Sequence, residues 1–220
     1  MTGGDLHPAW AGQLREGLSR LDLPLGPDRQ QRLLTFLGLL RRWNRAFNLT
    51  AIRDPEQMVS RQLLDSLSIL PLMAGPRVLD VGTGPGFPGI PLAIARPAYA
   101  FTLLDSNGKK TRFVRQAVME LGLPNVEVVQ ERSEAWRPDA PFDTVTARAF
   151  APLPRLLALV GHLVADTGRV VAMTGVCPEQ EIAQIEARGL QAACRRLVVP
   201  GCAGERHAIL VTAPSGWDAG

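Results

Sequence analysis

The sequence is short of several kinds of residue, and each shortage excludes a class of protein. Its three cysteines are odd in number and include no CxxC pair, so we expect neither disulfides nor a zinc or other metal site. No apolar run reaches the roughly 18 residues that a membrane span needs. The N-terminal segment also lacks the basic and apolar regions of a secretory signal. These absences predict a protein of the reducing cytoplasm, without a membrane partner.

Lysine is also scarce: 22 of the 24 basic residues are arginine, and the only lysines are the neighbours Lys109 and Lys110. The net charge of +3 comes from the N-terminal part. Residues 1–62 carry nine arginines and six acidic residues, whereas residues 63–220 carry fifteen basic and fifteen acidic residues. Guanidinium groups suit phosphate because their donors are paired. A genome rich in G and C would produce the same bias, so the charge is a weak indication of a nucleic-acid partner.

Hydrophobic spacing predicts helices throughout residues 1–75. A modest helix is expected over 8–21 and a stronger one over 27–47, where leucines recur at helical intervals. An Asp-Pro pair begins a third predicted helix over 54–72, because Asp is a favoured cap and Pro suits the first helical position. We therefore expect an N-terminal helical extension over 1–75, followed by a second domain over 76–220.

After the extension the pattern changes to alternating strands and helices. Strands are expected over 78–81, 100–104, 126–129, 142–147 and 168–173. Helices are expected over 89–95, 109–121, 152–164 and 179–187, with a short turn or helix over 133–136. The last two β segments, 191–199 and 206–212, predict an antiparallel hairpin. Repeated βα units predict an α/β, Rossmann-like fold with a doubly wound, mostly parallel sheet of seven strands.

A glycine turn stands between the first strand and the first helix of that pattern. Gly82, Gly84 and Gly86 occupy alternate positions, which lets the backbone adopt positive φ and pass close to a ligand. The helix that follows offers N–H groups and a partial positive charge at its N-terminus. The turn therefore predicts a site for a nucleotide-sized ligand.

Two registers of this turn predict different ligands. Gly84, Gly86 and Gly89 form the GxGxxG of a dinucleotide site, with Asp105 about 20 residues further on, as in an NAD(P)-dependent oxidoreductase. In the other register Asp80 precedes GxGxG, as in S-adenosylmethionine sites. Its carboxylate would attract a sulfonium and an ammonium group but repel a pyrophosphate. A terminal antiparallel strand is also typical of methyltransferases, so we favour S-adenosylmethionine as the cofactor.

Six blocks of sequence resemble one family and together span nearly the whole chain. They are WNRAFNLTAI (43–52), LLDSL (63–67), VLDVGTGPGFPGIPLAI (78–94), LLDSNGKKTRF (103–113), FDTVTARAFAPL (142–153) and GERHAIL (204–210). The family they resemble is the ribosomal small-subunit methyltransferase G family, also called glucose-inhibited division protein B. The resemblance implies methylation of the N7 atom of guanine 527 in the 530 loop of 16S rRNA, with S-adenosylmethionine as methyl donor.

The resemblance also implies site residues by motif position. The implied cofactor contacts are Gly82, Phe87, Ser133, Glu134 and Arg148, to which the fold adds Asp80, Gly84, Gly86 and Asp105. Two positions depart from the family pattern: Gln62 stands where His is usual, and Thr174 stands where Lys is usual. Neither departure touches the glycine turn. The second leaves open whether another basic residue contacts RNA, and whether the chain is instead a non-catalytic cofactor- or RNA-binding module.

No catalytic base is expected, because guanine N7 has a lone pair and carries no proton. The protein would mainly align the reactants and exclude water. Arg148 is expected to position a phosphate or the cofactor carboxylate, while His7, His162 and His207 are interpreted as surface or packing residues. A nucleophilic Cys177 is the alternative, and it would indicate methylation at a pyrimidine C5 atom.

Nine basic side chains are candidate contacts to the backbone of 16S rRNA or of a small-subunit precursor. They are Arg41, Arg42, Arg45, Arg53, Arg61, Lys109, Lys110, Arg112 and Arg115. The last four lie on one predicted helix and spread over more than one face, so a solvated surface is an equal alternative. Asn48 and Asp65 are expected to lock the helical extension onto the second domain, and Trp43 and Phe47 to lie in the core. A monomer is the favoured form, although the sequence leaves the oligomeric state open.

Overall fold

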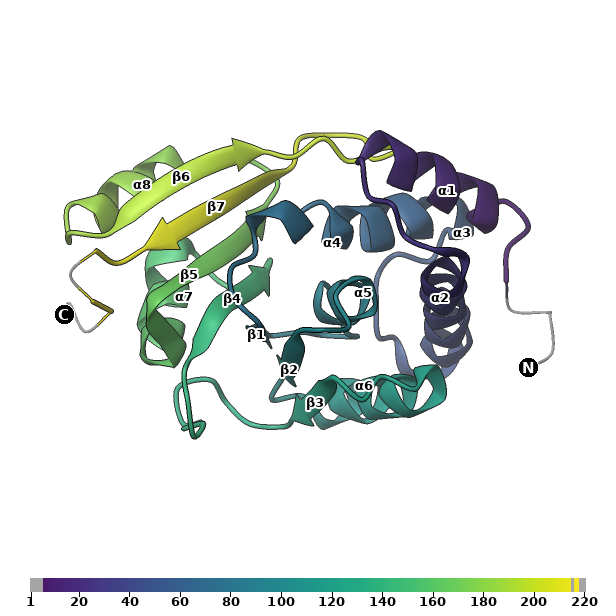
Figure 1. The fold of residues 1–220 in the computed structure, drawn as a ribbon, viewed down its shortest axis with the longest axis horizontal. Helices are drawn as coiled ribbons and strands as arrows, with labels where there is room; N and C mark the ends of the chain where they lie inside the picture. Colours follow the sequence, from purple (N-terminus) through teal and green to yellow (C-terminus); the bar gives the residue numbers. More distant parts are fainter. Residues whose placement is uncertain (1–5, 215, 218–220) are drawn as a thin grey trace.

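The computed structural model describes residues 6–214, 216 and 217, which form a seven-stranded sheet covered by helices on both faces (Figure 1). The strands lie in the order β3-β2-β1-β4-β5-β7-β6. Strands β1 to β5 are mutually parallel, and β7 runs antiparallel to both β5 and β6. Their bounds are β1 Arg77–Val81, β2 Ala100–Leu104, β3 Val126–Val129, β4 Phe142–Arg148, β5 Val164–Thr174, β6 Gln191–Arg196 and β7 His207–Thr212.

Helices cover the two faces of the sheet in two groups (Figure 1). On one face lie α5 (Gly89–Ala95), α6 (Gly108–Leu121) and the N-terminal helices; on the other lie α7 (Leu153–Val160) and α8 (Glu179–Glu186). Two separate clusters of buried apolar side chains correspond to these faces. The arrangement confirms the predicted doubly wound α/β fold with a terminal antiparallel hairpin. The predicted helix over 152–164 ends earlier, because a 3-10 turn, η3 (Gly161–Leu163), leads directly into β5.

The N-terminal helices follow the predicted pattern with one local change. α1 (Trp10–Arg20) and α2 (Pro27–Phe47) lie where hydrophobic spacing placed them. The predicted third helix is a chain of short segments: α3 (Pro55–Met58), the π-helical η1 (Val59–Leu64), α4 (Asp65–Leu67) and the 3-10 turn η2 (Leu70–Leu72). Asp54 caps α3, because its Oδ1 accepts a hydrogen bond of 3.0 Å from the Glu56 N–H.

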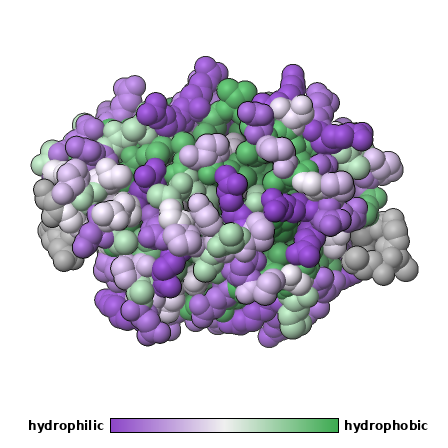
Figure 2. Space-filling model, in the orientation of Figure 1, coloured by the Kyte–Doolittle hydropathy of each residue, from purple (hydrophilic) through white to green (hydrophobic). Residues whose placement is uncertain are grey.

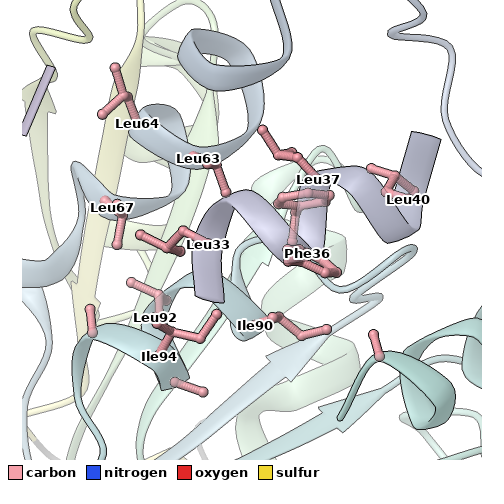
Figure 3. Close-up of a cluster of buried hydrophobic side chains, with 14 of the residues drawn as sticks. Leu33, Phe36, Leu37, Leu40, Leu63, Leu64, Leu67, Ile90, Leu92 and Ile94 are labelled. Atoms are coloured by element: carbon pink, nitrogen blue, oxygen red, sulfur yellow. The ribbon is translucent and has the colours of Figure 1, made fainter. Parts of the chain in front are cut away.

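The N-terminal helices and the sheet share one hydrophobic core. Figure 3 shows Leu33, Phe36 and Leu37 of α2 facing leucines of η1 and α4 on one side and Ile90 of α5 on the other. Each fully buried side chain of this size contributes roughly 1.5–3 kcal/mol relative to an exposed one. This packing fixes α4 against the sheet, close to the carboxyl ends of the parallel strands. The domain boundary between residues 75 and 76 stays a prediction.

The structure pairs Cys177 with Cys194 in a disulfide, so the expectation of no disulfide was wrong. Cys177 precedes α8 and Cys194 lies in β6, and the return of the chain from α8 into β6 brings their Cα atoms to 6.3 Å. That separation is within the usual range for a disulfide. Spacing along the sequence carries no sign of the pairing, because it arises from tertiary contact. Cys202 is a free thiol.

The face of the molecule seen in Figure 1 is largely hydrophilic. Figure 2 shows polar and charged residues over most of it, with hydrophobic residues visible between them. Within the described part of the chain, no helix is both long and apolar enough to cross a membrane.

Candidate active site

The glycine turn after β1 has the conformation that its sequence predicts. Gly82, Gly84 and Gly86 have φ angles of 65°, 58° and 93°, in the left-handed region that favours glycine. A Cβ at position 82 would also clash with the ring of Phe150. The Gly84 N–H donates to Oδ2 of Asp105 at 2.9 Å, which ties the turn to the end of β2.

A cavity of about 560 Å³ opens at the carboxyl ends of β1, β2 and β4. Five residues predicted to bind the cofactor line it: Gly82, Asp105, Ser133, Glu134 and Arg148. The parallel strands end at this edge of the sheet, which is where open α/β sheets usually bind ligands. Its volume is typical of sites for small molecules, which enclose about 300–1,000 Å³. The structure therefore brings the turn, the Asp105 carboxylate and the segment over 133–134 into one site.

Two acidic side chains of this cavity are held by nearby donors. Asp105 accepts from the N–H of Gly84 and, at 2.8 Å, from the N–H of Asn107, so the carboxylate is fixed at the cavity wall. Oε2 of Glu134 accepts from the Ser133 hydroxyl at 3.0 Å. Its own backbone N–H and that hydroxyl hold the pKa of the exposed Glu134 below its usual range. Both carboxylates are therefore placed to attract cations or ligand hydroxyl groups.

The structure corrects the position expected for the Asp80 carboxylate. It is completely buried behind the turn, where Oδ2 accepts from the Thr83 hydroxyl at 2.6 Å and from the Gly89 N–H at 2.8 Å. Oδ1 accepts from the Thr146 hydroxyl at 3.3 Å. Burial raises the pKa of Asp80 to about 6, although these hydrogen bonds act in the opposite direction. Asp80 thus braces the turn and the start of α5, and its carboxylate does not face the cavity.

Phe87 also lies away from the cavity. Its side chain is buried, and its ring packs 5.0 Å from that of Phe36, measured between centroids. The guanidinium of Arg148 lies over the ring of Phe87, with Cζ 5.2 Å from the ring centroid, in a cation–π contact. Phe87 therefore supports Arg148 rather than lining the cavity itself. Gly84 and Gly86 are likewise not among the residues that line the first cavity.

A second, smaller cavity lies on the other side of Arg148 and is lined by several charged groups. It has a volume of about 220 Å³, and its lining includes Arg61, Asp65, Arg148, Thr174, Arg206 and His207. Oδ2 of Asp65 lies 3.3 Å from Nη1 of Arg148, and Oδ1 lies 3.4 Å from Nε of Arg206. Burial raises the pKa of Asp65, while the two guanidinium groups act to lower it. Asp65 joins the N-terminal helices to the sheet, as predicted.

Two expectations for the helical extension need correction. Asn48 is exposed; it ends α2 in the left-handed conformation and accepts only from Arg53 among the described contacts. Trp43 packs 5.6 Å from Phe113 at the core, but Phe47 is 46% exposed. His207 is brought to the second cavity, with its Nδ1 2.9 Å from the Gly175 carbonyl oxygen.

The two residues that depart from the family pattern occupy different environments. Gln62 is buried in η1, where Nε2 donates to the Thr50 hydroxyl at 3.2 Å and Oε1 lacks a partner within the described chain. It lines neither cavity. Thr174 lines the second cavity, and its hydroxyl donates to the Val176 carbonyl oxygen at 3.2 Å. The short side chain of Thr174 thus stands in a cavity that already contains three arginines.

The nine candidate RNA contacts do not form one continuous cluster. Lys110 lines the first cavity and Arg61 the second, whereas Lys109, Arg112 and Arg115 line a separate groove on α6. The α6 cations therefore point in more than one direction, as predicted. Arg41, Arg42 and Arg45 lie on α2, and Arg42 forms an ion pair of 3.4 Å with Glu120 of α6. Arg53 donates to Asn48 at 2.6 Å.

Several side chains of the two cavities were missed by sequence reasoning, among them Glu131 and Arg132 of the first cavity. Phe150 and Arg155 line the first cavity, and Arg206 lines the second. Phe150 and Arg155 follow the end of β4, and Arg206 directly precedes β7. A search of every segment next to the carboxyl edge of the sheet would have found them. Within the described residues, no group of three His, Cys, Asp or Glu side chains is arranged to hold a metal ion.

Comparison with known sequences gives strong similarity over nearly the whole chain. A family model described as rRNA small subunit methyltransferase G matches residues 29–209. A protein of Marinobacter nauticus named ribosomal RNA small subunit methyltransferase G is 53% identical over 205 residues, which cover 93% of this chain and 96% of the relative. A protein of the same name from Alkalilimnicola ehrlichii is 50% identical over 215 residues, which cover 98% of this chain and 96% of the relative.

Comparison with solved structures supports the fold. The glycopeptide N-methyltransferase MtfA, in complex with S-adenosylmethionine, has a TM-score of 0.61 at 12% identity; the match covers 76% of this chain and 98% of that chain. Precorrin-6y C5,15-methyltransferase of Geobacter metallireducens has a TM-score of 0.53 at 17% identity, covering 76% of this chain and 92% of that chain. At such low identity these matches indicate a shared architecture and nothing about the substrate.

Proposed function

The chain belongs to the rRNA small subunit methyltransferase G family, and on that premise we propose that it methylates the N7 atom of guanine 527 in 16S rRNA. The family assignment establishes an S-adenosylmethionine-dependent methyltransferase, as the sequence predicted. The choice of base and atom comes from the family resemblance. The proposal therefore needs support from the site and a direct test.

The mixed charge of the first cavity fits the cofactor. S-adenosylmethionine carries ribose hydroxyl groups, a sulfonium, an ammonium and a carboxylate. The cavity offers carboxylates at Asp105, Glu131 and Glu134, and cations that include Arg132 and Arg155. Carboxylates suit the hydroxyl and cationic groups, whereas guanidinium groups suit the carboxylate. Gly82 forms part of the cavity wall, where the Phe150 ring leaves no room for a Cβ.

The observation that carries the proposal is the position of this cavity beside the arginine-rich second cavity. When bound, the cofactor supplies an activated methyl group. The protein then has to align the acceptor and exclude water, because N7 carries no proton to remove. Arg148 stands between the two cavities, and no histidine lies among the described lining of the first one. Arg148 is therefore placed to contact groups of both the cofactor and the RNA.

The structure argues against the alternative hypothesis of an NAD(P)-dependent oxidoreductase. In a dinucleotide site the first helix after the turn presents its N-terminal N–H groups to the pyrophosphate. Here the Gly89 N–H donates to the Asp80 carboxylate at 2.8 Å, which places a buried acid where a phosphate would need a donor. A titration with S-adenosylhomocysteine and with NAD separates the two readings. We expect saturable binding of the first and none of the second.

Methylation of small ribosomal subunits in vitro tests the reaction. Subunits that lack the mark are incubated with the purified enzyme and S-adenosylmethionine carrying a labelled methyl group. We expect one labelled N7-methylguanine, at position 527 of 16S rRNA. Label at another nucleotide, or on another atom of guanine, would contradict the proposal. A ribosomal RNA substrate implies a cytoplasmic enzyme, with 16S rRNA or a small-subunit precursor as partner, and we propose that it acts as a monomer.

A further inference from the structure

The second cavity adjoins the first, because Arg148 and Ala149 line both. Its volume of about 220 Å³ is less than half that of the first. Pockets for whole small molecules usually enclose about 300–1,000 Å³, so the second cavity suits one chemical group of a larger ligand. Ala149 has a φ angle of 49°, and strained conformations of this kind occur preferentially at functional sites.

The charged groups of the second cavity favour an anion. Three arginines line it, Arg61, Arg148 and Arg206, against one carboxylate, that of Asp65. The positive charges therefore outnumber the negative one. Nη1 of Arg61 also donates to Oε1 of Gln57 at 3.1 Å. Planar guanidinium groups bind phosphate oxygens through paired N–H donors, which a single ammonium cannot reproduce. Among the anionic groups of RNA, the backbone phosphodiester is the one that this lining would recognise.

Asp65 lies between two of these guanidinium groups, with a hydrogen bond to Arg148 through Oδ2 and an ion pair with Arg206 at Oδ1, which accepts no hydrogen bond from the described residues. Each of its oxygens contacts one arginine, at 3.3 Å for Arg148 and 3.4 Å for Arg206. Arg148 is held further by the Arg61 carbonyl oxygen at 3.3 Å and by the Phe87 ring. Nη1 of Arg206 donates to the Glu205 carbonyl oxygen at 2.8 Å. Among the described residues, no hydrogen bond uses Nε or Nη2 of Arg148, or Nη2 of Arg206, so these remain donors for a ligand.

We propose that the second cavity binds a backbone phosphodiester of the RNA, next to the nucleotide that is methylated, and that Asp65 positions Arg148 and Arg206 for it. This inference rests on the proposed function, because it names the substrate group that the neighbouring cavity holds. A phosphate contact fixes the register of the RNA without reading its sequence. It would hold the target nucleotide at the Arg148 side of the first cavity.

Variants of Arg206 test the phosphate contact in the full-length enzyme. We expect Arg206→Ala to raise the KM for 16S rRNA at least fivefold, with S-adenosylhomocysteine affinity unchanged. The slope of log affinity for an rRNA transcript against log salt should fall by about 0.7, the value for one contact to single-stranded RNA. Arg206→Lys should keep the slope but bind more weakly, because it keeps the charge and loses the paired donors. Arg188→Ala, an exposed arginine after α8, is the matched control and should match the wild type.

Asp65→Asn separates positioning from overall charge. The substitution removes a negative charge from the cavity, so long-range attraction alone would strengthen RNA binding. Positioning predicts the reverse: a KM for rRNA raised at least threefold, with an unchanged circular-dichroism spectrum as evidence that the protein is folded. Tighter binding of RNA by Asp65→Asn would overturn the role of Asp65.

Two results distinguish this inference from the proposed function. Wild-type enzyme that methylates rRNA, together with an Arg206→Ala variant whose KM and salt slope equal those of Arg188→Ala, would overturn the phosphate site alone. Wild-type enzyme that binds S-adenosylhomocysteine but neither binds nor methylates rRNA would overturn both. The expected result is a reduced salt slope in Arg206→Ala and an unchanged slope in Arg188→Ala.

Discussion

The carboxylate of Asp65 in α4 lies 3.3 Å from the guanidinium of Arg148 at the end of β4. This contact joins the N-terminal helices to the edge of the sheet where both cavities open. Asp65 is held there by the apolar packing of η1 and α4 against α2 and α5. The N-terminal helices therefore do more than cover the sheet, because they orient an arginine that lines both cavities.

Arg148→Ala should weaken binding of both S-adenosylhomocysteine and rRNA by at least severalfold. The variant removes a guanidinium from both cavities and leaves the buried Asp65 carboxylate with Arg206 alone. Isothermal titration measures the first affinity and filter binding the second. Arg195→Ala, an exposed arginine in β6, is the control. Unchanged affinities together with unchanged turnover would refute the role given to Arg148.

Gly82→Ala should abolish cofactor binding while the protein stays folded. Position 82 has a φ of 65°, and a Cβ there would clash with Phe150 at the cavity wall. The matched control is Gly12→Ala in α1, where a Cβ meets no atom within 4 Å. Alanine is the better helix former, so the control should be neutral or slightly more stable. Wild-type affinity of Gly82→Ala for S-adenosylhomocysteine would contradict the assigned site.

Asp80 should make the stability of the protein depend on pH between about 4 and 7. The pKa of Asp80 in the folded protein is about 6, above its ordinary value of 3.8. Its contribution is therefore fully present below pH 3.8 and is lost as the pH rises through about 6. The loss should reach about 3 kcal/mol at most, since one pKa unit corresponds to about 1.4 kcal/mol.

Urea unfolding of the wild type and of Asp80→Asn at several pH values measures this effect. The variant cannot titrate at this position, so the free energy of unfolding of the wild type minus that of the variant should fall between pH 4 and pH 7. A difference that stays constant, or that rises with pH, would show that Asp80 is ionised in the folded protein at low pH.

Sequence reasoning located the elements and the turn because these depend on local chemistry. Hydrophobic periodicity marked the strands and α2, and the alternate glycines marked the positive φ angles. The prediction that the Asp80 carboxylate faces the ligand was wrong, because the folded turn supplies its hydrogen-bond partners. Thr83 and Gly89 compete with a ligand for this acid, and the charge argument considered only the ligand.

Contacts between distant segments were the other part that the sequence did not reveal. Arg206 reaches Asp65 only because β7 lies beside β5, which brings the start of β7 to the carboxyl edge of the sheet. The pairing of Cys177 with Cys194 arises in the same way, from the return of the chain into β6. Neither pair has a spacing along the chain that would indicate the contact.

Cys177→Ala should retain methyl transfer. The residue is half-buried next to the core beneath α7 and α8, and it lies outside the described lining of both cavities. A reaction at guanine N7 needs no covalent intermediate with the enzyme. Turnover is measured with small ribosomal subunits as substrate, and S-adenosylhomocysteine binding reports folding. Loss of turnover with cofactor binding intact would require a different mechanism.

The most direct test of the central claim is mass spectrometry of 16S rRNA from a strain in which the gene for this chain is deleted. The fragment that contains guanine 527 should lose one methyl group from N7. The wild-type gene should restore the mark, and a gene that encodes Gly82→Ala should not. A strain without the gene that still carries N7-methylguanine at this position would contradict the account.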